Sequence, residues 1–183
     1  GGSSISVALM DKVLAVDRDA PTVTVQAGAR VQAVVDALAE LGLTLENYAS
    51  IAEQQLGGFT QVSAHGTGAL VPPVDDQVIA LTLVTAAGAV LRLRVDAETE
   101  AERRLFRLAR VGLGALGVVT ELTLRVVPRH LLREVSWIIP RKEACDPTLN
   151  AAMIRRHRHV RYMWVPYTDD VIVVASDAVA TDP

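Results

Sequence analysis

The stretch GLGALGVVTELTLRV, residues 112–126, carries glycines at positions 112, 114 and 117. This is the G-x-G-x-x-G spacing of a dinucleotide-binding fingerprint, in which a strand leads into the glycines and a helix follows them. Here the order is reversed. The amphipathic segment at residues 96–111 precedes the glycines, and the alternating segment at residues 118–127 follows them. No helix N-terminus is placed to hold a pyrophosphate, so the sequence argues against a Rossmann fold.

Two interpretations of these glycines remain. In the first, Gly112 ends the preceding helix and Gly114 and Gly117 form a tight turn into the next strand. In the second, three glycines in six residues leave bare backbone that lies against a flat ligand. The residues alone do not separate these interpretations.

Hydrophobic periodicity predicts the surrounding elements. Residues 12–28 and 77–95 alternate on both sides of turn signals and indicate two β-hairpins, the second turned at Ala87 and Gly88. Residues 29–42 indicate a helix that Gly42 caps. In the helix at residues 96–111 we expect Leu105, Leu108 and Ala109 to point inward. Residues 43–70 show no clear period.

Composition limits the classes of function. Half of the 183 residues are hydrophobic, so a sizeable core can form, and no apolar run reaches the ~20 residues needed to span a bilayer. A net charge of −3 and 4% aromatic residues argue against nucleic acid as a partner. Cys145 is the only cysteine, which excludes an intramolecular disulfide. The first residues resemble the middle of a protein, so we expect a preceding segment.

A second glycine-rich stretch, NYASIAEQQLGGFTQVSAHGTGALVPP, covers residues 47–73. Irregular stretches of this length are uncommon unless they are functional or disordered, and its apolar residues argue against disorder. Gly57–Gly58 and Gly66–Thr67–Gly68 present backbone N–H groups of the kind that form anion nests. His65 is a general base, a metal ligand or a packed structural residue. No second ligand lies at useful spacing, so we expect no metal site.

With these residues, the chain resembles the aldonolactone oxidoreductases, flavoproteins of the vanillyl-alcohol oxidase superfamily with a PCMH-type FAD-binding domain. The resemblance extends from about residue 4 to residue 177. The stretches that carry it are VALMDKVLAVD (7–17), the long run from TVQAGARVQ to LVTAAG (24–88), LARVGLGALGVVTELTLRVVPRH (108–130) and RHVRYMWVPYTDDVIVVASD (158–177).

The resemblance implies that both glycine clusters contact FAD. Ala49, Ser50 and Ile51 would run past the isoalloxazine ring, and Gly117, Val118 and Val119 would lie near the adenosine. The residues expected to line the ring and the pyrophosphate are Gly57, Gly58, His65, Gly66 and Thr67. Related lactone oxidases typically carry glycine where this chain has Ala49. The methyl group of Ala49 would keep oxygen from reduced flavin; the alternative is an alanine that is simply tolerated in a loop. Ser63 departs from the glycine common at that point of the family motif.

The resemblance to the plant mitochondrial members also implies a function. They oxidise L-galactono-1,4-lactone to L-ascorbate and pass electrons to cytochrome c. We therefore expect a flavoprotein on the intermembrane-space side of the mitochondrial inner membrane. The alternative is a non-catalytic subunit associated with the assembly of respiratory complex I.

The expected architecture is α+β: a mixed-sheet FAD-binding domain at residues 1–128, then the start of an antiparallel substrate-capping domain at 129–183. We expect a short linking segment at residues 148–159. The family's N-terminal pyrophosphate loop and its C-terminal Glu and Arg pair for the lactone are not in this sequence. No catalytic residue is therefore assigned, and we expect the chain alone to be inactive.

Overall fold

The computed structural model describes residues 4–48 and 51–179. It consists of two compact units, which are described separately. The first unit comprises residues 1–66 and 72–129, and the second comprises residues 67–71 and 130–183. The chain therefore passes between the units at Gly66, at Pro72 and after Arg129.

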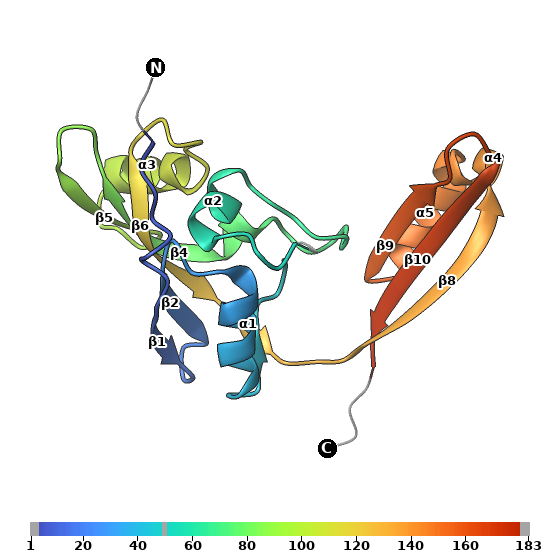
Figure 1. Cartoon of the computed structure of the whole chain (residues 1–183), viewed down its shortest axis with the longest axis horizontal. Helices are drawn as coiled ribbons and strands as arrows, with labels where there is room; N and C mark the ends of the chain where they lie inside the picture. Colours follow the sequence, from blue (N-terminus) through green and yellow to red (C-terminus); the bar gives the residue numbers. More distant parts are fainter. Residues whose placement is uncertain (1–3, 49–50, 180–183) are drawn as a thin grey trace. The chain divides into compact units, whose positions relative to one another are not determined.

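The first unit is built on a five-stranded sheet with the strand order β1-β2-β6-β4-β5 (Figure 1). Its strands are β1 (Val13–Asp17), β2 (Thr22–Gln26), β4 (Val78–Val84), β5 (Val90–Arg94) and β6 (Val118–Arg125). Every pairing in this sheet is antiparallel. Both predicted hairpins are confirmed, and Gly88 has a φ of +79° in the second turn. The expectation of a mixed sheet is wrong, because β6 returns antiparallel between β2 and β4.

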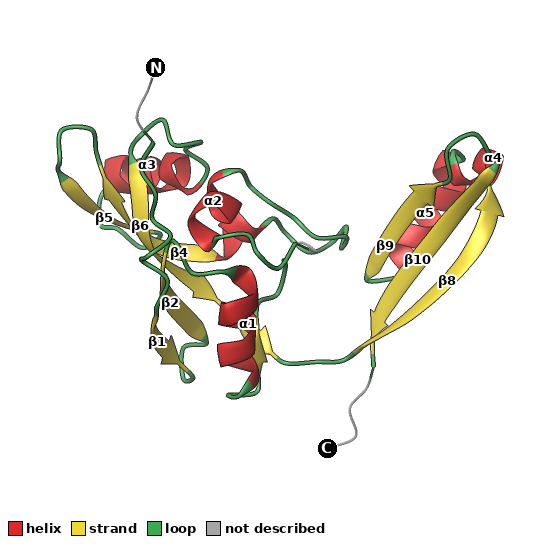
Figure 2. Cartoon of the chain, in the orientation of Figure 1, coloured by secondary structure: helices red, strands yellow, loops and turns green. Residues whose placement is uncertain are grey.

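The helices of the first unit lie against this sheet (Figure 2). They are α1 (Val31–Ala39), α2 (Leu56–Gln61), the 3-10 turn η1 (Val74–Gln77) and α3 (Glu100–Arg110). A short pair, β3 (Leu43–Thr44) with β7 (Val127–Pro128), completes this unit. The C-cap of α1 is Glu40, and the predicted Gly42 lies in the turn that follows, with a φ of +72° and its N–H donating to the carbonyl of Ala39.

In α3 the structure corrects one inward position. Ala109 is buried and Leu105 is half-buried, as predicted, but Leu108 is 56% exposed. Phe106 takes the buried place instead, at 1% exposure. A capping box formed by Thr99 and Glu102 fixes the start of this helix.

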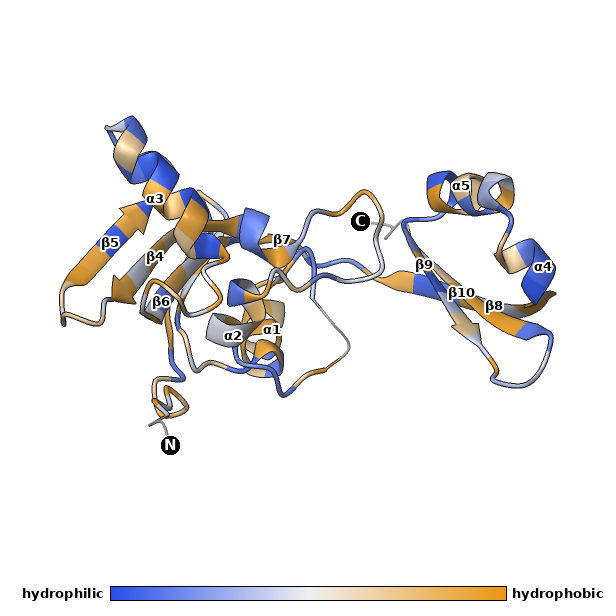
Figure 3. Ribbon diagram, turned by 90° about the horizontal axis from the view of Figure 1, so that it is seen from above, coloured by the Kyte–Doolittle hydropathy of each residue, from blue (hydrophilic) through white to orange (hydrophobic). Residues whose placement is uncertain are grey.

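The core of the first unit follows from strand alternation. Val25, Leu81, Leu93 and Leu122 are buried beneath the helices, whereas the threonines between them, such as Thr123, are only half-buried. Along β5, Figure 3 shows the arginines as blue segments within the orange strand. One face of the sheet therefore supplies the core, and the other is polar.

The second unit is a three-stranded antiparallel sheet with the order β8-β10-β9. Its elements are β8 (Leu132–Pro140), α4 (Arg141–Ala144), α5 (Pro147–Arg156), β9 (His159–Trp164) and β10 (Asp170–Ala178). The segment expected as a short link at residues 148–159 contains most of α5. None of the helices in the described residues is long and apolar enough to cross a membrane.

Candidate functional site

A buried asparagine organises the second glycine-rich stretch. Asn47 is 3% exposed, and its side-chain oxygen accepts a 2.8 Å hydrogen bond from the N–H of Gly66. Its side-chain nitrogen donates to the carbonyl of Pro72 at 2.7 Å. A Cβ on Gly66 would lie 2.3 Å from this same oxygen, so only glycine fits there. Sequence reasoning missed Asn47, because its partners lie 19 and 25 residues along the chain.

The start of α2 connects the two glycine clusters. The N–H of Gly57 donates to the carbonyl of Ala27 at 2.7 Å, and the N–H of Ala27 donates to the carbonyl of Thr120 in β6 at 2.9 Å. Thr120 follows the predicted residues Gly117, Val118 and Val119. A Cβ on Gly57 would meet Ala27 Cβ at 2.8 Å. Gly57 is therefore required by packing within the chain, and the contact brings α2 to the first residues of β6.

Gly58 differs from its neighbour, because a Cβ there would meet no atom of the chain within 4 Å. In the same glycine-rich stretch, Tyr48 is 44% exposed and Ile51 is 58% exposed. Gln54 Oε1 is buried without a hydrogen-bond partner within the described part of the chain. Open backbone, exposed apolar side chains and an unsatisfied acceptor fit a flat, polar-edged ligand such as FAD. Ala49 and Ser50, also predicted here, lie outside the described residues.

The loop that carries Ile51 is fixed to the N-terminus of α1. The carbonyls of Ala52 and Gln54 accept from the N–H groups of Gln32 and Val31, at 3.2 and 2.9 Å. These N–H groups have no partners within their own helix, and no side chain caps them. The carbonyl groups of the loop thus provide hydrogen-bond partners for the N–H groups at the start of α1, and these bonds hold the loop against the helix.

His65 is exposed, and its Nδ1 lies 2.9 Å from the carbonyl of Gly66. The interpretation of His65 as a packed structural residue is therefore wrong. Among the residues that the structure describes, no three His, Cys, Asp or Glu side chains gather to hold a metal ion. Thr67 belongs to the second unit, where its carbonyl accepts from Val160.

The glycines at 112–117 form a turn. Gly114 has a φ of +75° and Gly117 a φ of +146°, and a Cβ on Gly117 would lie 2.3 Å from the carbonyl oxygen of Val84. This confirms the turn interpretation, because the chain's own backbone fills the space beside Gly117. Val118 is half-buried and Val119 is 6% exposed and packs in the core. Contact between Val119 and a ligand would have to come from its backbone.

Ser63 stands where the family motif commonly has glycine, and its environment shows how a serine is accommodated there. Its φ is +53°, in the left-handed region that glycine adopts without cost. Its hydroxyl donates to Oδ1 of Asp75 at 2.7 Å, and Asp75 is 7% exposed. The hydroxyl is therefore engaged within the chain, and the bond offsets the backbone strain.

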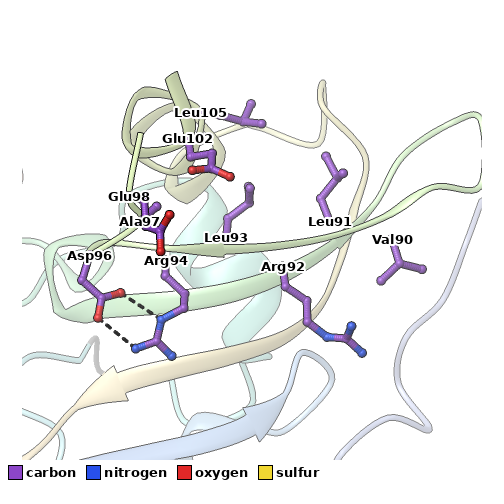
Figure 4. Close-up of a pocket in the computed structure, with 10 residues that line it drawn as sticks. All are labelled: Val90, Leu91, Arg92, Leu93, Arg94, Asp96, Ala97, Glu98, Glu102 and Leu105. Carbon is purple, nitrogen blue, oxygen red and sulfur yellow. Dashed lines mark hydrogen bonds and ion pairs between the residues drawn. The ribbon is translucent and has the colours of Figure 1, made fainter. Parts of the chain in front are cut away.

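A separate groove of about 560 Å³ runs between β5 and α3 (Figure 4). None of the predicted site residues lines it. Arg94 forms a forked ion pair with Asp96, at 2.9 and 3.1 Å, which raises the pKa of Arg94 and lowers that of Asp96. Glu98 and Glu102 lie at the α3 side of the groove. Both side chains of this ion pair are well exposed to solvent.

Comparisons with known proteins agree with the resemblance. The chain is 49% identical to the mitochondrial L-galactono-1,4-lactone dehydrogenase of Arabidopsis thaliana over 96% of its length and 32% identical to the L-gulonolactone oxidase of Bos taurus, also over 96%. It spans 28% and 39% of those proteins. Structurally, it matches cholesterol oxidase from B. sterolicum with a TM-score of 0.79 at 20% identity, over 97% of this chain and 36% of that chain.

The cholesterol oxidase match shows the fold alone, and it agrees with the α+β class. The model of the family described as "FAD binding domain" matches residues 1–94 of the 183. The region matched contains Gly57, Gly58, His65, Gly66 and Thr67. On this evidence the chain belongs to the FAD binding domain family, and its cofactor is FAD.

Proposed function

We propose that the longer protein containing this chain is an FAD-dependent aldonolactone dehydrogenase, and that this chain forms one side of its FAD site. The observation that carries the proposal is 49–51% identity to plant L-galactono-1,4-lactone dehydrogenases over at least 93% of the chain. The chain spans 28% of those relatives, so the activity belongs to the longer protein. Residues 1–128 would belong to the FAD-binding domain and residues 129–183 to a substrate-capping domain.

The FAD contacts that we propose come from backbone and small side chains. Gly58 leaves its backbone open to a ligand, and Ile51 offers apolar surface for a ring. Gln54 Oε1 is an acceptor for a donor group of the cofactor. The other proposed contacts are Ala49, Ser50, Gly57, His65, Gly66, Thr67, Gly117, Val118 and Val119. When bound, FAD supplies the two-electron acceptor that oxidation of a lactone requires, while the chain's residues hold and orient it.

The proposed substrate is L-galactono-1,4-lactone, which loses two electrons and two protons to give L-ascorbate. Cytochrome c is the proposed acceptor, and the intermembrane-space side of the mitochondrial inner membrane is the proposed location. Ala49 would limit the reaction of reduced flavin with oxygen, so Ala49→Gly should accelerate oxygen consumption. No residue of this chain is assigned a catalytic role, since the lactone-binding Glu and Arg pair belongs to the remainder of the family's sequence.

The experiment that tests the function is the visible absorbance spectrum of the purified full-length protein. A flavin spectrum that bleaches when L-galactono-1,4-lactone is added without oxygen, and returns with oxidised cytochrome c, supports the proposal. A flavin that no aldonolactone bleaches overturns the substrate assignment. If the full-length protein contains no flavin, the proposal that it is a flavin-dependent enzyme is overturned. A role in complex I assembly would then be tested by co-purification.

A further inference from the structure

Residues Thr67–Val71 form a short excursion, which we call the 67–71 finger. The chain leaves the first unit after Gly66, enters the second unit for these five residues, and returns at Pro72. The N–H of Val71 donates to the carbonyl of Gly68 at 3.2 Å, which closes the finger into a turn. The finger therefore belongs to the second unit, although the sequence on both sides of it belongs to the first.

The neck of the finger is fixed in the first unit. Asn47 binds Gly66 on the entering side and Pro72 on the returning side through the two ends of one amide group. Asn47 is almost fully buried, so both bonds are partly shielded from bulk water. One side chain thus holds both ends of the finger at a fixed separation.

The finger itself is held by the start of β9. Thr67 Oγ1 lies 3.3 Å from Nδ1 of His159, and the carbonyl of Thr67 accepts from the N–H of Val160 at 3.2 Å. The imidazole also fits closely against the turn, since a Cβ on Gly68 would lie 3.2 Å from His159 Cε1. His159 is thus the side chain of the second unit that both packs on the finger and bonds to it.

Two residues of the finger line a small cavity of about 160 Å³ in the second unit. Thr67 and Ala69 line one wall, and Ile154, His157, Val160 and Tyr162 line the rest. The finger and these side chains of β9 and α5 therefore border one cavity. A change at β9 would act directly on the backbone that follows Gly66.

We propose that His159 is a positioning residue: by binding Thr67 it sets the conformation of the Gly66–Thr67 peptide and so the affinity for FAD. The inference rests on the proposed function, which places His65, Gly66 and Thr67 at the cofactor. Gly66 is fixed by Asn47 in one unit and Thr67 by His159 in the other. Loss of the contact between His159 and Thr67 would therefore free the Thr67 end of this peptide.

The test uses the full-length protein with His159→Ala, His159→Asn and, as a matched control on an exposed neighbouring position of β9, Arg161→Ala. Two quantities are measured: amide hydrogen exchange of a peptide covering residues 64–72, and the Kd for FAD after the cofactor is removed. Asparagine places a polar atom where histidine has Nδ1, so it can restore the bond to Thr67. Thermal unfolding of each variant confirms that it is folded.

We expect His159→Ala to accelerate exchange in residues 64–72 and to raise the Kd for FAD about fivefold, as loss of one hydrogen bond implies. His159→Asn should return both quantities to within about twofold of wild type on the same scale. Unchanged hydrogen exchange in His159→Ala would show that His159 does not hold the finger in place. Faster exchange with an unchanged Kd overturns the positioning role. Absence of FAD from the wild-type protein overturns the proposed function itself. The exchange data then still show whether His159 holds the finger in place.

Discussion

The side-chain amide of Gln61, in the last position of α2, accepts a hydrogen bond from the backbone N–H of Gly112 at 3.2 Å. Its Nε2 donates to the carbonyls of Ala109 and Arg110 at 2.7 and 3.1 Å. Carbonyl groups at the end of a helix have no partners within the helix. Gln61 therefore caps α3 from outside it and joins α2, the helix that contains Gly57 and Gly58, to the first glycine of the 112–117 turn.

Gln61→Glu should destabilise the first unit by about 2 kcal/mol. A carboxylate cannot donate to the carbonyls of Ala109 and Arg110, and its charge opposes the negative end of the α3 dipole. Denaturant unfolding measured by circular dichroism checks the value. The matched control is Gln32→Ala at an exposed position of α1, which should change the unfolding free energy by less than about 0.5 kcal/mol. Equal effects of the two changes would show that the cap contributes nothing.

The sequence predicted the elements whose patterns are local. Both hairpins of the first unit and α1 follow from residues within one element, and α3 does except for Leu108. The helix α2 was missed because LGGFTQ contains two glycines and is too short to show a helical period. The functions of Gln61 and Asn47 were not predictable, since each binds backbone atoms at least 19 residues away. The resemblance supplied the expected FAD residues, whereas the structure separates those used in packing from those left open.

Ser63→Gly and Ser63→Ala separate two opposing contributions at one residue. Both changes remove the bond to Asp75, worth about 1.5–3 kcal/mol for a charged acceptor, but only glycine also relieves the left-handed conformation, which costs about 1–2 kcal/mol. We expect the order of stability to be wild type, then Ser63→Gly, then Ser63→Ala. Urea unfolding checks this order. If Ser63→Gly were more stable than wild type, the bond to Asp75 would not offset the strain.

Asn47→Asp should give a pH-dependent defect at the neck of the finger. The carboxylate still accepts from Gly66 but cannot donate to Pro72, and burial of its charge should cost about 3 kcal/mol at pH 7. Burial raises the pKa of such a group, and the protonated carboxyl can donate again. Relative to wild type, the variant should therefore recover stability as the solution is acidified. Asn47→Ala lacks this group, and recovery in that variant as well would contradict the explanation.

The free energy of unfolding of the second unit should decrease in two steps as the solution is acidified. Burial, Arg158 and His130 lower the pKa of His159 from its usual 6.5, although Asp177 opposes them. The unfolded state then binds the proton first, so stability is lost as the pH falls from about 6.5 through the lowered pKa. Asp177 has its pKa lowered from 3.8, mainly by the hydrogen bond from His157 at 2.6 Å, so its contribution is lost below about 3.8.

Tryptophan fluorescence can follow these two steps in the 183-residue chain, because its two tryptophans, Trp137 and Trp164, both lie in the second unit. His159→Asn should remove the upper step and retain the lower one. Asp177→Asn should remove the lower step. An upper step that persists in His159→Asn would assign it to another group.

Gly57→Ala and Gly58→Ala distinguish a glycine required for folding from a glycine required for FAD binding. At Gly57 the new methyl group would lie 2.8 Å from Ala27 Cβ and 2.9 Å from its carbonyl oxygen, so the backbone must shift. We expect a loss of about 2 kcal/mol, typical of overpacking in a tight core. At Gly58 the methyl group meets no atom of the chain, and alanine in a helix is favoured over glycine by up to about 1 kcal/mol.

Gly58→Ala should therefore preserve or raise the thermal stability of the cofactor-free protein. If the open surface at Gly58 is where FAD approaches, the same methyl group should weaken FAD binding by about tenfold, equivalent to about 1.4 kcal/mol. The two quantities then change in opposite directions, which a folding defect cannot produce. Fluorescence titration with FAD and a thermal melt without it provide both measurements. A stable Gly58→Ala variant with wild-type affinity would place the cofactor away from α2, and the FAD contacts proposed for Gly57 and Gly58 would have to be withdrawn.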